Sequence, residues 1–460
     1  MKYYFSLILF LLFIANSFSQ SANDILNVLV GQNTISQNTA DSLRAEYAIK
    51  QLTILPDKKL RIDAEFRPRT EYRNGYQQLR NDSSSGAFFT NQRLRLSANY
   101  VYDNRFAMQV SVQDLRVWGQ QDPRSTSATL QIFEGWVEPY INNKFSVRIG
   151  RQRLVYDNQR LFAENDWRLS AAVHDAINFR LNTARLSSEL ALAFNQSSER
   201  YFGTDYAPQG FINYKFLAVN YLRYRPDNKF TLTAINSTDG YQDKTSPEKM
   251  NLRYTLGGRL EFDINGIYST LSGYYQGGKN SSGVSLDAWY LQPELRITGS
   301  KGLVARLGAE IMSGNNNSIA GDTDHSFVTL YGVAHRFNGS MDLITRFPGD
   351  VRGAGLINPY LFFIKPLFSK FELRADFHTF HLQQDYYNND LKIDRYLGFE
   401  NDFLITYKPN SVTKVDLGVS YMLPTESFEV IKNSGSSRYN LTWVYLSLTF
   451  RPQLLGLNFK

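Results

Sequence analysis

Arginine is the residue type that recurs in this sequence at spacings that could support chemistry. In residues 60–73, apolar side chains occupy alternate positions, and arginines and acids occupy most of the positions between them. A period of two places successive side chains on opposite faces of a β-strand. Neither a soluble core nor lipid tolerates so charged a face, so it must line water. By this alternation, the following arginines fall on inward faces: Arg67, Arg69, Arg93, Arg95, Arg148, Arg180, Arg253, Arg259, Arg296, Arg306 and Arg374.

Four more arginines, Arg151, Arg153, Arg160 and Arg168, lie in one long connection between two alternating segments. Arginine stays charged and presents a planar fork that suits carboxylates. A ladder of such groups would pass an anionic chain along a pore by weak, exchangeable contacts. We therefore predict that these arginines bind substrate, and that the four in the connection form a constriction or an entrance. Acids are interleaved with the ladder, so the arginines could equally pair across strands and stiffen the wall.

The alternating pattern recurs as far as residues 444–450, which indicates many strands rather than one exposed edge strand. Some segments are separated by short polar turns, at 103–104, 142–143, 227–228 and 265–266. Others are separated by longer connections, among them 151–175, 312–326 and 346–359. Short turns that alternate with long loops are typical of outer-membrane barrels. The sequence therefore predicts an all-β fold, a transmembrane antiparallel up-and-down β-barrel of about 16–18 strands with short periplasmic turns and long extracellular loops.

Composition narrows the class of protein. The chain has 460 residues and no cysteine, so it has neither disulfides nor a thiolate metal site. Hydrophobic residues make up 43%, yet the mean hydropathy is −0.36, which is too polar for a helical membrane protein but suits a barrel. The net charge of +7 is a modest excess, and we predict no nucleic-acid partner, no metal and no cofactor.

The start of the chain reads as a targeting segment. Lys2 precedes an apolar run, and small residues stand before Gln20, so residues 1–19 are predicted to be a signal peptide. Helical spacing after it predicts a short periplasmic helical or linker segment over residues 20–56. Residues 57–460 are then the barrel, placed in the cell outer membrane of a Gram-negative bacterium after Sec signal cleavage.

Four motifs give the chain a family resemblance. They are the string GRQRLVYDNQRLFAENDWR from Gly150 to Arg168, His335-Arg-Phe-Asn-Gly339 followed by Asp342, the segment Gly398–Asp402, and Trp443-Val-Tyr445-Leu446. In this order and spacing they resemble the alginate-export family of outer-membrane barrels, over roughly residues 57–450. The resemblance implies eighteen strands and secretion of an anionic exopolysaccharide such as alginate. It also implies periplasmic partners from an export machine, beside the lipid and lipopolysaccharide of the membrane.

Catalytic motifs are weak. The run Gly273–Asn280 nearly matches a phosphate loop, but Asn280 stands where Ser or Thr is needed and no helical pattern follows. We therefore predict a transport protein that is not an enzyme. Two alternatives stay open: a general or anion-selective diffusion porin or uptake channel for small solutes, and a secreted soluble all-β enzyme that acts on polysaccharide. The sequence identifies neither the sugar nor the direction of transport, because arginine binds carboxylate, sulfate and phosphate alike.

Overall fold

The computed structural model describes residues 39, 57–122, 129–206, 214–243, 246, 248–319 and 321–459. The chain divides into two compact units, one formed by Met1–Lys58 with Asn458–Lys460 and the other by Lys59–Leu457. The second unit carries the strands. The predicted signal peptide over residues 1–19 lies outside the described residues, and so does the predicted helical segment over 20–56 apart from Thr39.

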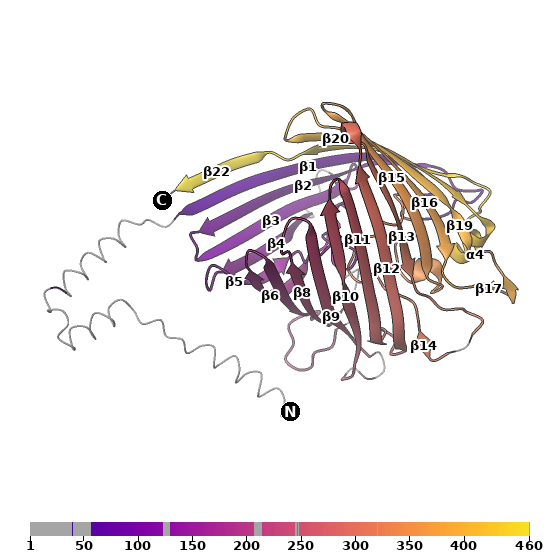
Figure 1. Cartoon of the computed structure of the whole chain (residues 1–460), viewed down its shortest axis with the longest axis horizontal. Coiled ribbons are helices and arrows are strands. Elements are labelled where there is room, and N and C mark those ends of the chain that lie inside the picture. Colours follow the sequence, from indigo (N-terminus) through magenta and orange to yellow (C-terminus); the bar gives the residue numbers. More distant parts are fainter. Residues whose placement is uncertain are drawn as a thin grey trace. The chain divides into compact units, whose positions relative to one another are not determined.

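Across the described residues, eighteen long strands form one closed antiparallel barrel, in which each pairs with the next (Figure 1). The predicted fold class is confirmed. The long strands are β1 (Lys58–Asn74), β2 (Ala87–Tyr102), β3 (Phe106–Val117), β4 (Leu130–Pro139), β5 (Phe145–Gln152), β6 (His174–Asn182), β7 (Leu186–Phe194), β8 (Phe216–Tyr224), β9 (Phe230–Gln242), β10 (Met250–Ile264), β11 (Ile267–Lys279), β12 (Ser285–Thr298), β13 (Val304–Met312), β15 (Leu356–Phe368), β16 (Phe371–Leu382), β19 (Tyr396–Tyr407), β20 (Thr413–Pro424) and β21 (Leu441–Phe450).

The barrel closes where the last long strand pairs with the first. In the register of β1 and β21, Phe66 lies opposite Phe450 and Asn74 opposite Thr442. Pro452 then interrupts the strand because proline has no backbone N–H to donate. A final segment, β22 (Gln453–Phe459), continues beside β1, and the two run side by side in Figure 1. The pairing of β21 with β1 closes the barrel wall, as a barrel in lipid requires.

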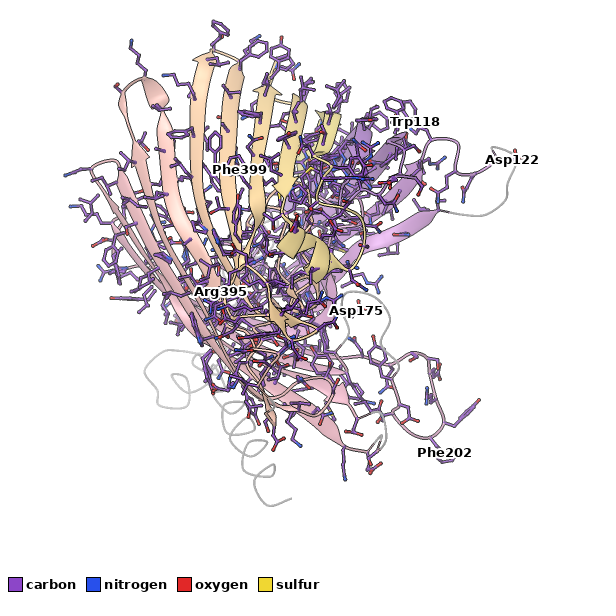
Figure 2. The ribbon with its side chains drawn as sticks, turned by 90° about the vertical axis from the view of Figure 1, so that its right-hand side faces the viewer. Trp118, Asp122, Asp175, Phe202, Arg395 and Phe399 are labelled. Atoms are coloured by element: carbon purple, nitrogen blue, oxygen red, sulfur yellow. The ribbon has the colours of Figure 1, made fainter. Side chains whose placement is uncertain are left out.

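The two faces of the barrel differ as the alternation predicts. On β2, Leu94 and Leu96 are exposed on the outside, whereas Arg93, which precedes them, is completely buried inside. Rows of apolar side chains of this kind follow most of the long strands, and Phe399 on β19 belongs to one of them (Figure 2). An apolar outer face meets lipid, while the charged inner face stays away from it.

Short turns and long connections alternate around the barrel. The short turns predicted at 103–104, 142–143, 227–228 and 265–266 are all present at one end. Long connections join the other ends, and one of them carries the exposed Phe202 away from the strands (Figure 2). By the outer-membrane convention, the short-turn end faces the periplasm and the long-loop end faces outside.

The prediction of two separate connections at 312–326 and 346–359 is wrong. They are parts of one excursion, 313–355, which we call the second inward loop. It holds the short strand β14 (Thr323–Asp324), parallel to β12, and the 3-10 helix η3 (Gly349–Val351). Its apolar residues imitate a strand in the sequence, but they pack inside the barrel. The connection 153–173, the first inward loop, also enters the lumen, as expected for the predicted long loop.

The apolar core of this unit lies inside the barrel, between the two inward loops and the wall. Phe162 of the first inward loop forms a parallel bridge with Tyr331 of the second, and both are buried. Leu217 and Val219 on the inner face of β8 are completely buried in the same cluster. The loops are therefore packed elements of the fold that fill much of the lumen.

The minor elements lie in the remaining connections. They are η2 (Ser300–Gly302) between β12 and β13, the hairpin β17 (Tyr387–Asn388) and β18 (Leu391–Lys392) between β16 and β19, and α4 (Glu426–Lys432) between β20 and β21. No helix among the described residues is both long and apolar enough to cross a membrane.

Candidate functional site

The first inward loop crosses the lumen from one wall to the other. Asp157 accepts hydrogen bonds from Tyr221 Oη of β8 (3.0 Å) and Tyr274 Oη of β11 (3.2 Å). Asn158 Nδ2 donates to Gln292 Oε1 of β12 at 2.8 Å. Burial raises the pKa of Asp157, although these hydrogen bonds oppose the rise. Because the loop starts at β5 and ends at β6, these contacts with β8, β11 and β12 make it a constriction.

Arg160 fastens this loop to the wall and to the second inward loop. Its Nη2 lies 3.0 Å from Glu310 Oε2 of β13 and 2.7 Å from Asn338 Oδ1, and its Nη1 donates to the Val333 carbonyl at 2.8 Å. The side chains of Arg160 and Glu310 are both fully buried. Tyr290 Oη also donates to Glu310, at 2.5 Å. The predicted site residue Arg160 is thus a clamp between three elements.

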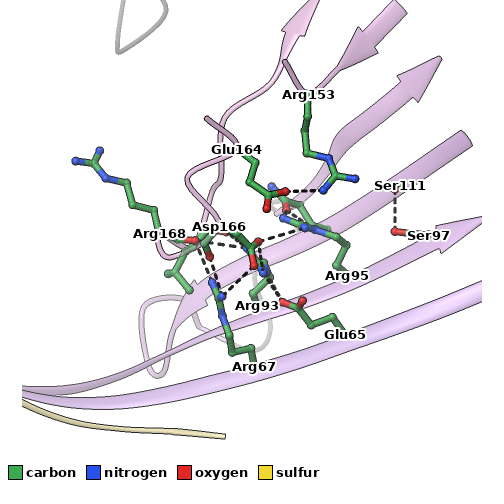
Figure 3. A network of polar contacts seen from close by, with 12 residues as sticks. Glu65, Arg67, Arg93, Arg95, Ser97, Ser111, Arg153, Glu164, Asp166 and Arg168 are labelled. Carbon is green, nitrogen blue, oxygen red and sulfur yellow. Dashed lines mark hydrogen bonds and ion pairs between the residues drawn. The ribbon is translucent and has the colours of Figure 1, made fainter. Parts of the chain in front are cut away.

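Wall arginines hold the far end of the same loop (Figure 3). Arg67 Nη1 donates to the Asp166 carbonyl at 2.8 Å, and Arg69 Nη1 to the Trp167 carbonyl at 3.2 Å. Arg93 Nη2 donates to Asp166 Oδ1 at 2.7 Å. Burial alone would raise the pKa of Asp166, but Arg93 and Arg67 outweigh it and hold that pKa below its ordinary value. The loop carboxylate is therefore anionic across physiological pH.

The second inward loop meets the first through stacked rings. His335 stacks on Trp167 with ring centroids 4.2 Å apart and planes 6° from parallel, and Arg69 Cζ lies 4.2 Å from the Trp167 centroid. His335 Nδ1 is 2.9 Å from Asp342 Oδ1, and Tyr76 Oη donates to the other oxygen of Asp342. Burial would raise the pKa of Asp342, but His335 and these hydrogen bonds hold it below its ordinary value.

Two inward acids of β19 hold the turn that precedes Asp342. Glu400 Oε1 accepts from the Met341 N–H at 2.8 Å, and Asp402 Oδ2 from the Ser340 N–H at 3.1 Å. Gly339 has φ +79°, and a Cβ there would lie 2.4 Å from the carboxyl carbon of Glu400. Only glycine fits, because the backbone is left-handed and touches the carboxylate.

Trp443 of β21 completes the cluster. Its ring meets Trp167 edge-on with centroids 5.6 Å apart, and its Nε1 donates to Glu71 Oε2 of β1 at 2.9 Å. All four sequence motifs that carry the family resemblance therefore meet at one place, although residues far apart in the chain supply them. We call this cluster the lumenal node and define it by Trp167, His335, Asp342, Glu400 and Trp443.

Most of the other arginines predicted to bind substrate are paired within the wall or with the first inward loop. These contacts join Arg95 to Gln113 (2.9 Å), Arg148 to Glu138 (2.6 Å), Arg153 to Glu164 (2.6 Å) and Glu134 (3.1 Å), Arg180 to Glu138 (2.9 Å) and Glu189 (3.1 Å), Arg253 to Asp239, Arg259 to Glu261 (2.7 Å), Arg306 to Glu294 (2.6 Å), and Arg374 to Asp376 (2.5 Å). Arg148, Arg180, Arg253 and Arg306 pair across strands, as the interleaved acids suggested, whereas Arg259 and Arg374 pair with acids two residues along their own strands.

The sequence led us to expect Arg151 at a constriction or an entrance, but it lies on the outer face of the barrel. Strand β5 continues to Gln152, so Arg151 shares the outward parity of Ile149. It pairs with Asp175, its partner across β6, at 2.9 Å, and both side chains are well exposed. The physical reason is that the strand is longer than predicted, which keeps this arginine on the outer face.

Three lumenal arginines are different because, among the described residues, no acid or hydrogen-bond acceptor pairs with their guanidinium groups. Arg168 projects away from the network in Figure 3, and Arg296 lies over the Tyr268 ring at 4.4 Å. Arg336 belongs to the second inward loop and was missed as a site residue, since alternation assigns no face within a loop. Burial and the charges of Arg306 and Arg374 lower the pKa of Arg336, as expected for a cation without an acidic partner.

The inward loops divide the remaining space into cavities. On the long-loop side, a cavity of about 420 Å³ is lined by Arg69, Arg73, Arg116 and Arg168 together with Tyr76, Phe89 and Trp167. In the described part of the chain, no acid lines it. On the short-turn side, one cavity of about 600 Å³ holds Arg296 and Arg336, and another of about 330 Å³ lies beside β4 to β6.

A closed antiparallel barrel with an apolar outside, a charged lumen and inward-folded loops defines a porin-like channel of the outer membrane. The chain belongs to the alginate export family, which matches residues 58–346, more than half of the 460. The match ends before β15, so Glu400 and Trp443 of the lumenal node lie beyond it.

Solved structures share this fold at low sequence identity. OpdO from Pseudomonas aeruginosa is 12% identical with a TM-score of 0.58, and the match covers 86% of this chain and 98% of that one. A BenF-like porin from Pseudomonas fluorescens Pf-5 is 9% identical with a TM-score of 0.59, covering 86% and 99%. The Pseudomonas aeruginosa protein opdK is 10% identical with a TM-score of 0.56, covering 87% and 99%. No curated protein matches the chain.

Proposed function

We propose that this channel conducts anionic substrates and that its substrate is an anionic exopolysaccharide of the alginate type. The observation that carries the proposal is the cavity of about 420 Å³ on the long-loop side. The unpaired Arg168 lines it together with three aromatic rings, and Arg69 and Arg73 share a single acid, Glu71, which leaves an excess of positive charge there. The size of the cavity is within the range of small-molecule sites. Arginine forks bind carboxylates, and aromatic rings pack on the apolar faces of sugars. The family and the fold indicate a channel rather than an enzyme.

The unpaired arginines would be successive binding positions for substrate along the lumen. Arg168 lies on the long-loop side of the inward loops, and Arg296 and Arg336 lie on the short-turn side. A paired arginine has its donors occupied, whereas these three have donors free for a passing carboxylate. Contacts at separate points allow a chain to be held at one while it leaves another, as conduction requires. The periplasmic partners of such a path would be proteins of a polysaccharide export machine.

The test is ion selectivity of the purified full chain in planar lipid bilayers. We expect reversal potentials that indicate anion preference, and a preference that weakens with salt because charges are screened within about 10 Å at 0.1 M. The triple variant of Arg168→Gln, Arg296→Gln and Arg336→Gln should lose the preference. Arg151→Gln is the matched control, since the same chemical change on the outer face should leave selectivity unchanged. A cation-selective parent, or a triple variant as selective as the parent, would refute the proposal.

A second candidate is a diffusion porin for small anions. The observation that favours it is the size of the lumenal cavities, about 330 Å³ to 600 Å³, on the two sides of the inward loops. Small carboxylates fit such spaces, whereas a polymer needs the loops to move. Vesicle flux separates the two candidates: a porin passes glucuronate but excludes its oligomers, and an exporter-like channel passes both. The apolar outer face argues against the soluble enzyme that the sequence left open.

A further inference from the structure

The carboxylate of Asp166, in the first inward loop, lies among arginines from different parts of the wall. Its Oδ1 is 2.7 Å from Arg93 Nη2, and its Oδ2 is 3.0 Å from Arg451 Nη2, just after β21. Arg67 and Arg95 approach the same carboxylate to 3.6 Å and 3.7 Å. Figure 3 shows Arg67, Arg93 and Arg95 converging on it. The carboxylate therefore occupies an anion site that the barrel wall forms.

This site carries an excess of positive charge. Among the described residues, the acids within ion-pair distance of the four arginines are Asp166 and Glu65, which lies on β1. Four cations and two anions leave a formal excess of two positive charges (4 − 2). The Asp166 side chain is 29% exposed, so solution in the lumen reaches it. Further anions would be attracted to this place.

The backbone on either side of Asp166 is held by the same wall arginines. The carbonyl of Arg168 accepts from Arg67 Nη2 at 3.0 Å, and that of Leu169 from Arg93 Nη1 at 3.2 Å. In each of these contacts the loop supplies only an acceptor and the wall only an arginine donor. A carboxylate-bearing chain supplies acceptors of the same kind and with more charge, so it can compete for the same donors.

The other end of the loop is built differently. The Arg160–Glu310 pair is one cation with one anion, and both side chains are fully excluded from solvent. Removing one member of such a pair leaves a buried charge without compensation, which costs much free energy, so this contact keeps its end of the loop in place. The Asp166 site has surplus charge and its carboxylate is partly exposed to the lumen, and a second carboxylate in its place would keep the buried Arg93 paired. The loop thus has one fixed end and one exchangeable end.

We propose that Asp166 is an internal anion that occupies the arginine site while the channel is empty, and that a carboxylate of the substrate replaces it and frees the segment 164–169. This inference rests on the proposed function, because it requires that anionic substrate reaches the lumen. It adds an autoinhibitory contact and a substrate-binding site made of Arg67, Arg93, Arg95 and Arg451. The constriction then opens only when a polyanion is present to hold the wall arginines.

The experiment uses the full chain in planar bilayers with an oligomer of glucuronic acid as the probe and maltotriose as the neutral control. The parent should show more frequent or larger openings with the oligouronate and no response to maltotriose. Asp166→Asn keeps the shape but removes the charge, so it should be open without ligand and lose the response. Asp175→Asn is the matched control: it makes the same change at an exposed acid that pairs with the outer-face Arg151, and it should behave as the parent.

A second measurement needs no variant at position 166. Release of the segment removes Trp167 from its stack with Arg69 and His335, so the oligouronate should change the parent's tryptophan emission and leave Trp167→Phe unaffected. If the parent is anion-selective but Asp166→Asn has parental conductance and response, the exchange is wrong and the proposed function survives. An unchanged emission at concentrations that alter the current has the same meaning. A parent without anion selectivity overturns both proposals.

Discussion

Breaking the buried Arg160–Glu310 pair should loosen the constriction more than any other single charge removal in the lumen. Arg160→Met keeps the length of the side chain but removes the cation. Glu310 is then a fully buried carboxylate left with donors from Tyr290 (2.5 Å) and Asn338 (3.2 Å) only. Removing one partner of a buried pair costs about 3–5 kcal/mol. A loss of about 3 kcal/mol corresponds to a change of roughly a hundredfold in an equilibrium constant.

The cost should be visible both in stability and in current. Denaturant unfolding of the refolded protein in lipid vesicles, followed by tryptophan emission, gives the change in free energy of unfolding. Single-channel recordings of Arg160→Met should show large, long-lived openings that are rare in the parent. The control is Arg61→Met, because Arg61 is largely exposed and its partner Asp63 partly exposed, and pairs near the surface contribute about 0–1 kcal/mol.

The double variant Arg160→Met with Glu310→Gln separates this explanation from simple loss of packing. It leaves no bare charge, so it should recover most of the loss and come within about 1 kcal/mol of the parent. Two results would refute the reasoning: Arg160→Met no more destabilising than Arg61→Met, or a double variant no more stable than the single one. Either would mean that the loop does not depend on charge pairing at this clamp.

Two further predictions concern the second inward loop. Gly339→Ala should lower the free energy of unfolding by about 1–3 kcal/mol and increase current noise, because φ is +79° there and the new Cβ would lie 2.4 Å from the carboxyl carbon of Glu400. The control is Gly321→Ala, where a Cβ would meet nothing within 4 Å, and it should match the parent in the same unfolding assay. The depressed pKa of Asp342 contributes stability that is fully present above its unfolded pKa of about 3.9 and is lost as pH falls through the lower folded value. Unfolding free energies should therefore drop below about pH 4, and Asp342→Asn should make that drop smaller while Asp166 still contributes to it. A drop of unchanged size in the variant would contradict the linkage.

The barrel was predictable because its wall repeats one simple pattern. Leu94 and Leu96 face out and Arg93 and Arg95 face in, as a period of two requires. The Asn-Gly turn at 265–266 was equally clear, since such pairs adopt tight hairpin turns. Where a strand has lipid on one side and water on the other, the alternation of apolar and polar residues is enough to predict which side chains face which.

The lumen was not predictable in the same way, because its contents depend on contacts between distant residues. Arg160 and Arg336 lie in loops, where no period assigns a face, so sequence reasoning mistakes the first for a substrate ligand and overlooks the second. Leu217 and Val219 face inward although they are apolar, because an inward loop covers them. The alternation rule assumes a wet lumen, and it fails where the lumen contains packed protein.

The number of inward arginines is a poor guide to selectivity in this barrel. An arginine paired with an acid, such as Arg306 with Glu294 at 2.6 Å, contributes almost no net charge at a distance beyond the pair. Selectivity must then come from cations that lack a matching anion, which are the unpaired Arg168, Arg296 and Arg336 and the surplus at the Asp166 site. On the proposed function, a wall rich in both signs would favour anions because many of its acids pair with arginines, while others, such as Glu400 and Asp402, accept hydrogen bonds from the second inward loop.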